Sequence, residues 1–150
     1  MLTTIEKVIM LQEIDVFEHL TTDDLTFLAS IAEEMEYSEG AVVFNEGGIP
    51  DSMFYVLEGK VRLHRGKEEL MAAGKNDTFG TWALFDDEPR VATATAMEYT
   101  SVLRIDKEDF FDLLADNVRI TQGVMKALVQ RVRRLRGLAR PSLNLIPEKE

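Results

Sequence analysis

A chain of 150 residues is long enough for one domain with a packed core and leaves little sequence for a second. Its hydrophobic fraction of 45% excludes a disordered body, and the absence of cysteine excludes disulfides and thiol chemistry and fits a cytoplasmic location. No apolar run approaches the roughly 18–20 residues of a membrane span, so no span is expected.

The net charge of −10 is distributed unevenly along the chain. Residues 1–118 carry 9 Lys and Arg against 25 Asp and Glu, whereas residues 119–140 carry 7 Lys and Arg and no acid. An acidic body repels nucleic acid and anionic lipid over most of its surface. The basic segment either binds such a partner or, as the charge balance favours, lies against the acidic body or a second copy of the chain.

Helical patterns dominate the first part of the chain. A short helix is expected over residues 3–11, followed by an irregular connector. A second helix is expected to start at Thr21, which has an acid three residues on, with Leu20 and Leu25 as a hydrophobic staple. The apolar face that follows predicts that this helix continues to about residue 36.

The pattern changes at Tyr37, and from there to Ile105 short strand-like segments alternate with turn residues. The segments are 41–46, 53–58, 60–64, 68–73, 91–96 and 101–105. Arg65, Gly66 and Lys67 are expected to form a hairpin turn. Several strands at this spacing predict an antiparallel sandwich or barrel.

Two further helices are expected over about residues 106–136. Asp106 is a good cap for the first helix, and Asn117 for the second. Gly137 is the expected end of the second helix, ahead of a flexible tail at residues 141–150. The residues expected to bury the first helix are Phe110, Phe111, Leu113 and Leu114.

The last helix, residues 118–136, carries apolar residues at heptad-like spacing. These residues are Val118, Met125, Leu128, Val132 and Leu135. The spacing fits a lid over a ligand together with a homodimer seam, and it equally fits a helix docked on its own domain.

Residues 79–96, FGTWALFDDEPRVATATA, contain the candidate site. Small residues around Arg90 let a ligand approach the backbone, so N–H groups and the guanidinium can converge on one anion. The alternative for Arg90 is a structural salt bridge to the acidic run at residues 86–88. Trp82 either stacks on a base or, as is commoner, packs the segment against the strands.

This stretch resembles the phosphate-binding cassette of the cyclic nucleotide-binding domain family, whose approximate pattern is F-G-E-x-A-L, a variable loop and R-x-A-T. The matching residues are Phe79, Gly80, Ala83, Leu84, Arg90, Ala92 and Thr93. Thr81 departs from the pattern, because the family has Glu there. The order of helix, strands and two helices resembles the family over about residues 12–136.

The resemblance implies a mostly β fold: an antiparallel β-roll (double-stranded β-helix or jelly roll) at about residues 37–105, with N-terminal helices and a C-terminal helix pair, in a single domain of residues 1–140. It implies a non-catalytic regulatory module that binds cAMP or a related cyclic nucleotide. The implied ligand-binding residues are Phe79, Gly80, Thr81, Trp82, Ala83, Arg90, Val91, Ala92 and Thr93.

Within the family, the cassette Arg and backbone N–H groups hold the phosphate, the cassette Glu holds the ribose 2′-hydroxyl, and a C-terminal helix closes over the base. Thr81 therefore implies weakened binding of the ribose. Val91 tilts the choice toward cAMP, since members that prefer cGMP often have Thr there.

Other readings remain open. The chain is alternatively a degenerate module that serves as an interaction or dimerisation domain, or a regulatory fragment of a transporter, channel or transcription regulator. Only about ten residues follow Arg140, so no DNA-binding domain is expected. The two histidines, His19 and His64, lie in different elements, and no nucleophile–base pair is apparent, so neither a metal site nor an enzyme is expected.

Overall fold

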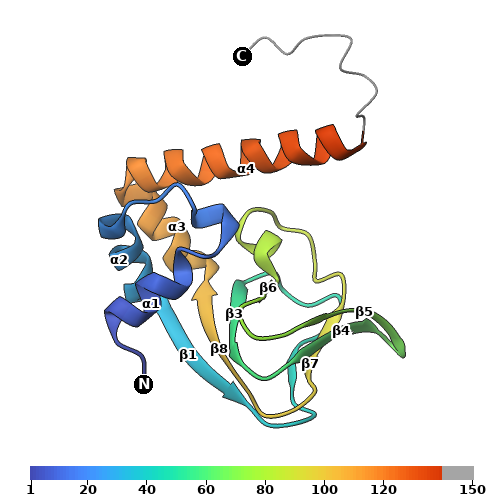
Figure 1. Cartoon of the computed structure of the whole chain (residues 1–150). Coiled ribbons are helices and arrows are strands. Elements are labelled where there is room, and N and C mark those ends of the chain that lie inside the picture. The colour runs from blue at the N-terminus through green and yellow to red at the C-terminus, as the bar shows by residue number, and fades with distance from the viewer. Residues whose placement is uncertain (140–150) are drawn as a thin grey trace.

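The computed structural model describes residues 1–139, and the tail expected at residues 141–150 lies outside them. Two antiparallel sheets of four strands form the body of the molecule, with the helices at one end (Figure 1). One sheet has the order β1 (Ala32–Tyr37), β8 (Thr100–Asp106), β3 (Ser52–Glu58) and β6 (Thr78–Phe79). The other has the order β2 (Val42–Phe44), β7 (Thr93–Ala96), β4 (Val61–Arg65) and β5 (Glu68–Ala73). The expected mostly β fold with flanking helices is confirmed.

The N-terminal elements are α1 (Thr4–Leu11), the 3₁₀ helix η1 (Asp15–Phe17) and α2 (Thr22–Ile31). Thr21 caps α2 as expected, because its hydroxyl accepts the N–H of Asp24 while the Asp24 carboxylate accepts the N–H of Thr21. This reciprocal pair satisfies two N–H groups that the first helical turn cannot.

The predicted extension of α2 to residue 36 is wrong. The helix ends at Ile31, and residues 32–37 form strand β1, so the strands begin before the expected start near residue 37. Strand β1 pairs with β8 along its whole length, from Ala32 opposite Ile105 to Tyr37 opposite Thr100. This ladder satisfies the main chain along one side of β8, and such tertiary pairing overrides local helix propensity.

Each of the six predicted strand segments contains a strand. The expected hairpin is confirmed, since Arg65 pairs with Glu68 and Gly66 has a φ of 57° in the turn between them. The short strand β6 has no counterpart in the prediction. It pairs with Phe54 and Tyr55 of β3 and leads directly into the candidate site.

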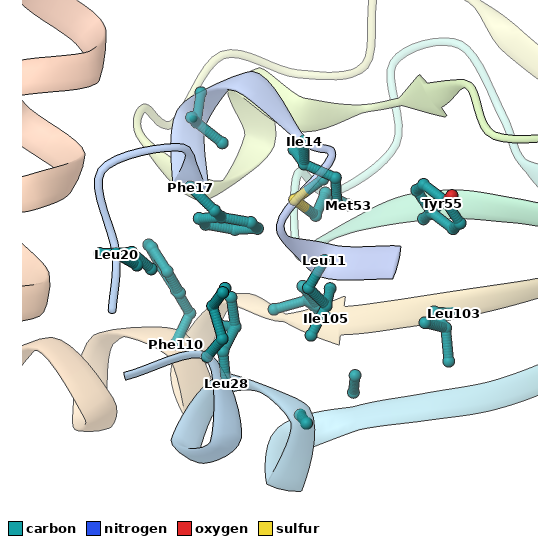
Figure 2. Close-up of a cluster of buried hydrophobic side chains, with 14 of the residues drawn as sticks. Leu11, Ile14, Phe17, Leu20, Leu28, Met53, Tyr55, Leu103, Ile105 and Phe110 are labelled. Atoms are coloured by element: carbon teal, nitrogen blue, oxygen red, sulfur yellow. The ribbon is translucent and has the colours of Figure 1, made fainter. Parts of the chain in front are cut away.

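Two clusters of buried side chains hold the molecule together. The larger cluster lies between the helices and the sheet that contains β3 and β8 (Figure 2). Its fully buried members include Leu11, Phe17, Leu28, Ile105 and Phe110. The smaller cluster fills the space between the two sheets, with Phe54, Val61, Phe79 and Val102 among its members. The candidate site at residues 79–96 therefore contacts both clusters, because Phe79 belongs to the smaller one and Leu84 to the larger one.

The C-terminal helices are α3 (Lys107–Asp116) and α4 (Val118–Ala139). The Asp106 carboxylate caps α3 by accepting the N–H of Asp109 at 3.1 Å, as expected. The Asn117 side chain instead donates to the carbonyl of Leu113, so it closes α3 rather than capping α4.

Two expectations for these helices are wrong. Phe111 is exposed whereas its neighbour Phe110 is fully buried, because consecutive residues of a helix point about 100° apart. Gly137 does not end α4, since the helix continues to Ala139 and Gly137 has no positive φ. A glycine inside a helix costs about 1 kcal/mol, which a long helix tolerates.

Candidate ligand-binding site

The candidate site begins where β6 ends, at a glycine that no other residue can replace without strain. Gly80 has a φ of 72° and precedes the 3₁₀ helix η2 (Thr81–Leu84). A Cβ on Gly80 would lie 2.7 Å from Nη1 of Arg90 and 3.5 Å from the carbonyl oxygen of Ser52. Glycine is therefore needed both for the left-handed backbone and for the close approach of the guanidinium.

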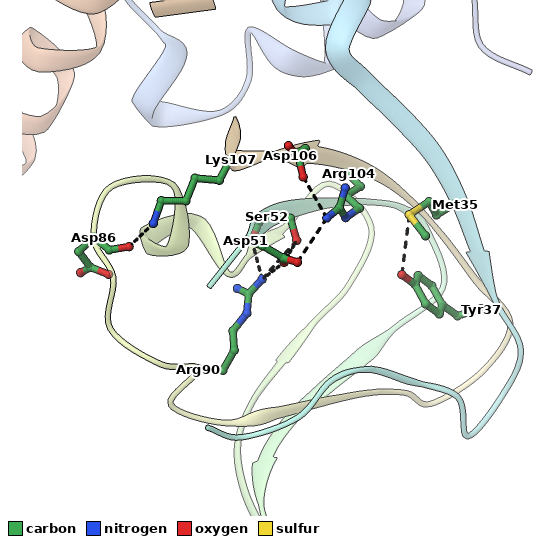
Figure 3. A network of polar contacts seen from close by, with 9 residues as sticks. All are labelled: Met35, Tyr37, Asp51, Ser52, Asp86, Arg90, Arg104, Asp106 and Lys107. Carbon is green, nitrogen blue, oxygen red and sulfur yellow. Dashed lines mark hydrogen bonds and ion pairs between the residues drawn. The ribbon is translucent and has the colours of Figure 1, made fainter. Parts of the chain in front are cut away.

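Arg90 is buried, with only 7% of its surface exposed. Its Nη2 donates to the main-chain oxygen of Ser52 at 2.8 Å and lies 3.5 Å from Oδ1 of Asp51 (Figure 3). The guanidinium carbon lies 4.0 Å from the centroid of the Phe44 ring. Burial lowers the pKa of the Arg90 guanidinium, and the Asp51 carboxylate works in the opposite direction. The group is thus held rigidly by neighbours that compensate only part of its charge.

Arg90 pairs with Asp51, and not with the acidic run at residues 86–88 that the sequence offered as an alternative. Asp51 lies far from residues 86–88 in the chain, and Asp87 instead pairs with Lys107, whose Nζ lies 3.0 Å from Oδ1. Asp51 also approaches Arg104, with its Oδ2 3.7 Å from Nη2 of that residue (Figure 3). The acidic run therefore leaves Arg90 available to the pocket.

One donor of Arg90 is unused. Among residues 1–139, the buried Nε of Arg90 is the side-chain nitrogen or oxygen without a hydrogen-bond partner. A buried donor left unpaired costs about 1–3 kcal/mol, so native proteins rarely keep one without a use. The hydrogen-bonding capacity of Arg90 is therefore not fully met within the domain.

The main chain around Arg90 is fixed by the turn after β2. The Gly47 N–H donates to the Arg90 carbonyl at 2.7 Å, and the Arg90 N–H donates to the Gly48 carbonyl at 3.0 Å. This two-way link aligns the loop before β7 with the turn at residues 45–48. The position of the guanidinium is therefore set by the backbone as well as by Ser52.

An open pocket of about 530 Å³ lies against these residues. Of the nine predicted site residues, all except Thr93 line it. Some of the lining residues that the prediction lacked lie in or next to the cassette: Thr78, Asp86, Glu88 and Pro89. The others come from distant parts of the chain: Phe44, Pro50, Leu63, Met71 and Arg131. Ligand pockets for small molecules are commonly about 300–1,000 Å³ and largely apolar, so this one has room for a nucleotide.

Thr93 has a structural task instead. Its hydroxyl accepts the N–H of Glu46 at 2.9 Å, which ties the turn after β2 to strand β7. Thr93 therefore supports the backbone that holds Arg90, and it lies outside the pocket lining.

Trp82 connects the pocket to the last helix. Its ring is partly exposed, lies against Phe85 with 6.3 Å between centroids, and has the guanidinium carbon of Arg131 4.6 Å from its centroid. Nη1 of Arg131 in turn lies 2.7 Å from Oδ2 of Asp15 in η1. Three elements that are distant in sequence thus meet around Trp82 and Arg131. Heptad spacing alone could not reveal that Arg131 contacts both Trp82 and Asp15.

The part of the chain that the structure covers has neither a candidate metal site nor a candidate membrane-spanning helix. Residues 1–139 contain no group of three or more His, Asp or Glu side chains arranged to hold a metal ion. Within the same range, none of the helices combines the length and the apolar character that crossing a bilayer requires.

Comparisons with known proteins find relatives that match most of this chain. The CRP-like cAMP-activated global transcriptional regulator of Mycobacterium tuberculosis is 27% identical over 124 residues, which cover 79% of this chain and 55% of that protein. The cAMP-dependent protein kinase regulatory subunit of Hypocrea atroviridis is 30% identical over 126 residues, which cover 83% of this chain and 25% of that protein. The chain thus spans about half the length of the first relative, and less of the second.

Solved structures show the same fold. The N-terminal domain of a transcriptional regulator from Streptomyces coelicolor superposes with a TM-score of 0.79 at 27% identity, covering 87% of this chain and 94% of that one. The catabolite activator protein of Thermus thermophilus superposes with a TM-score of 0.65 at 25% identity, covering 81% and 60%. These likenesses confirm the expected jelly-roll fold.

The family itself follows from a direct match. The model of the family described as "Cyclic nucleotide-binding domain" matches residues 34–117, which is more than half of the chain and includes the whole cassette. The chain therefore belongs to the cyclic nucleotide-binding domain family.

Proposed function

We propose that this domain is a non-catalytic regulatory module that binds cAMP or a related cyclic nucleotide in the pocket beside Arg90. The observation that carries the proposal is that Arg90 lines an open pocket while its guanidinium is buried and its Nε is unpaired within the domain. A guanidinium fork matches a phosphodiester, and exclusion of water strengthens that pair. Phe44, Leu63 and Met71 supply an apolar surface for the rest of the nucleotide.

The hydrogen bond that the cassette offers to the ribose 2′-hydroxyl is expected to be weaker than in the family pattern. Thr81 lines the pocket and offers a hydroxyl where the pattern has a carboxylate. Replacing a charged hydrogen bond by a neutral one costs about 1–2 kcal/mol, which corresponds to roughly five- to thirtyfold in affinity. We therefore expect cAMP to bind with reduced affinity, and Thr81→Glu to tighten binding by a factor in that range.

Isothermal titration calorimetry with cAMP and cGMP tests the proposal. The native protein should release heat with at least one of the two at millimolar ligand, and Arg90→Ala should abolish it. Arg62→Ala removes an arginine from β4 outside the pocket lining and serves as the matched control. Thermal unfolding of each variant shows that it is folded. Absence of heat from the native protein would leave only the degenerate, non-binding module.

A second role, homodimerisation through α4, is favoured by one specific observation. The outer face of α4, defined here as Val118, Met125, Val129, Val132 and Leu135, is apolar, and each member is between 50% and 67% exposed. Its opposite face, with Ile120, Val124 and Ala127, is buried against the body. Leu128, expected on the same seam, is partly buried against the larger core cluster instead. Apolar residues at heptad spacing on a free helix face are typical of helix pairing.

Sedimentation of the native protein over a range of concentrations tests the dimer. Val132→Glu places a charge on the outer face of α4 and should convert a dimer to a monomer. Lys126→Glu changes an exposed residue of the same helix away from that face, and should leave the mass unchanged. A native protein that is monomeric at every concentration would remove this role. A cytoplasmic location and a single domain over residues 1–140 stay predictions.

A further inference from the structure

The pocket lacks the family's ribose-binding carboxylate but contains a cation that the sequence pattern does not place there. Arg131 lies in α4, far from the cassette in sequence, yet it lines the same pocket as Arg90 and Thr81. We propose that Arg131 is a specificity-determining residue that donates a hydrogen bond to the ribose 2′-hydroxyl, in place of the missing Glu. This inference rests on the proposed binding of a cyclic nucleotide.

The position of Arg131 matches that role. Its guanidinium carbon lies 4.6 Å from the centroid of Trp82, and Trp82 directly follows Thr81 in η2. Arg90, by contrast, turns toward Ser52 and Asp51. The two guanidinium groups therefore have different neighbours within one pocket lining, and the proposal assigns the phosphate to Arg90 and the ribose to Arg131.

Arg131 is also held in place before any ligand arrives. Its Nη1 donates to Oδ2 of Asp15 at 2.7 Å, and its planar group lies over the Trp82 ring. A guanidinium carries five N–H donors in a rigid fork, so one contact with Asp15 leaves donors for a second acceptor. Because the side chain is already ordered by two neighbours, a ligand contact costs less conformational entropy.

The chemistry of the hydroxyl permits the exchange. A carboxylate reads a 2′-hydroxyl by accepting its proton, whereas a guanidinium reads it by donating to its oxygen, and a hydroxyl can take either part. The acids of the pocket wall, Asp86 and Glu88, are weaker candidates. Both are exposed, and Oδ1 of Asp86 already accepts the N–H of Glu88. Arg131, unlike these two acids, is partly buried and is held by contacts with Asp15 and Trp82.

The test compares cAMP with 2′-deoxy-cAMP by calorimetry on the full chain. The native protein should bind 2′-deoxy-cAMP about five- to tenfold more weakly, which is the size expected for one hydrogen bond to a charged group near a surface. Arg131→Ala should reduce that ratio clearly, to what the neutral Thr81 hydroxyl alone supplies. Lys126→Ala, which removes an exposed charge of the same helix, should leave it unchanged. Because the readout is the ratio of the affinities for cAMP and 2′-deoxy-cAMP, a general loosening of α4 in Arg131→Ala would weaken both ligands and leave the ratio unchanged.

The outcomes separate the inference from the proposed function. If the native protein binds neither cAMP nor cGMP, the proposed function fails and the inference fails with it. If cAMP binds but the ratio is already about 1, or if Arg131→Ala keeps the native ratio, the inference is overturned while the proposed function stands. Loss of the ratio in Glu88→Gln but not in Arg131→Ala would assign the ribose to the acidic loop and overturn the role of Arg131.

Discussion

The contact between Gly80 and Arg90 provides a sharp test of how the site is built. Gly80→Ala introduces a Cβ 2.7 Å from Nη1 of Arg90, about 0.8 Å inside an ordinary contact of about 3.5 Å. It also forces a side chain onto a backbone with a φ of 72°, which costs about 1–2 kcal/mol. Moving the tip of a buried arginine adds about 1–2 kcal/mol more. The free energy of unfolding should therefore fall by about 2–4 kcal/mol.

Gly40→Ala is the matched control. Gly40 has a φ of 85°, but nothing lies within 4 Å of the Cβ that it would carry. This variant should lose only the backbone contribution of about 1–2 kcal/mol and should bind ligand as the native protein does. Urea unfolding measures both losses, and the difference between the two variants isolates the contact with Arg90.

Ligand affinity gives the second readout. The displaced guanidinium in Gly80→Ala should weaken cAMP binding at least about tenfold, because a charged hydrogen bond is worth about 1.5–3 kcal/mol and depends on its geometry. If Gly80→Ala and Gly40→Ala lose the same stability and bind cAMP equally well, the close packing of Gly80 against Arg90 does not organise the site, and the reasoning is refuted.

Three further predictions concern stability. Phe110→Ala removes a fully buried ring from the larger cluster and should lower the free energy of unfolding in urea by about 3–5 kcal/mol; a loss below about 1 kcal/mol would contradict the packing. Thr21→Ala should cost about 1 kcal/mol in the same assay through loss of the α2 cap, and no change would show that the cap is dispensable. Asp15→Asn breaks a half-exposed pair with Arg131, so its effect on thermal unfolding should stay below about 1 kcal/mol and disappear in high salt; an effect that persists in salt would contradict an ionic origin.

Local signals in the sequence predicted local structure well. The caps at Thr21 and Asp106 depend on residues three positions apart, and both are confirmed. The turn at Gly66 is likewise set by neighbouring residues. The error at residues 32–37 has the opposite cause: the segment is a strand because β8, some seventy residues later, offers a ladder. Nothing within a short window of sequence reveals that partner.

The same division holds for the site. The cassette residues are close together in the sequence, so a sequence pattern could place them at one site. Most residues from Phe79 to Ala92 line one pocket, and Leu84, Phe85 and Asp87 are the exceptions. The partners of Arg90 were not predictable in this way, because Asp51 and Ser52 reach it through the pairing of β3 within the roll. Arg131 could not be predicted as a pocket residue either, because it reaches the pocket only through the docking of α4. The sequence showed only that this helix is apolar and basic.

The junction at Arg131 connects the pocket lining with α4 and with the N-terminal elements. Trp82 belongs to the cassette, Asp15 to the N-terminal elements and Arg131 to α4, so a ligand that shifts Trp82 or recruits Arg131 changes the free energy with which α4 docks. Such a ligand can move the helix only by as much as its affinity differs between the two positions, and couplings of this kind are typically about 1–3 kcal/mol. One half-exposed ion pair and one cation–π contact are each worth about 0.5–1 kcal/mol. Breaking this junction would therefore remove only part of the docking energy of α4, because Ile120, Val124 and Ala127 remain buried against the body.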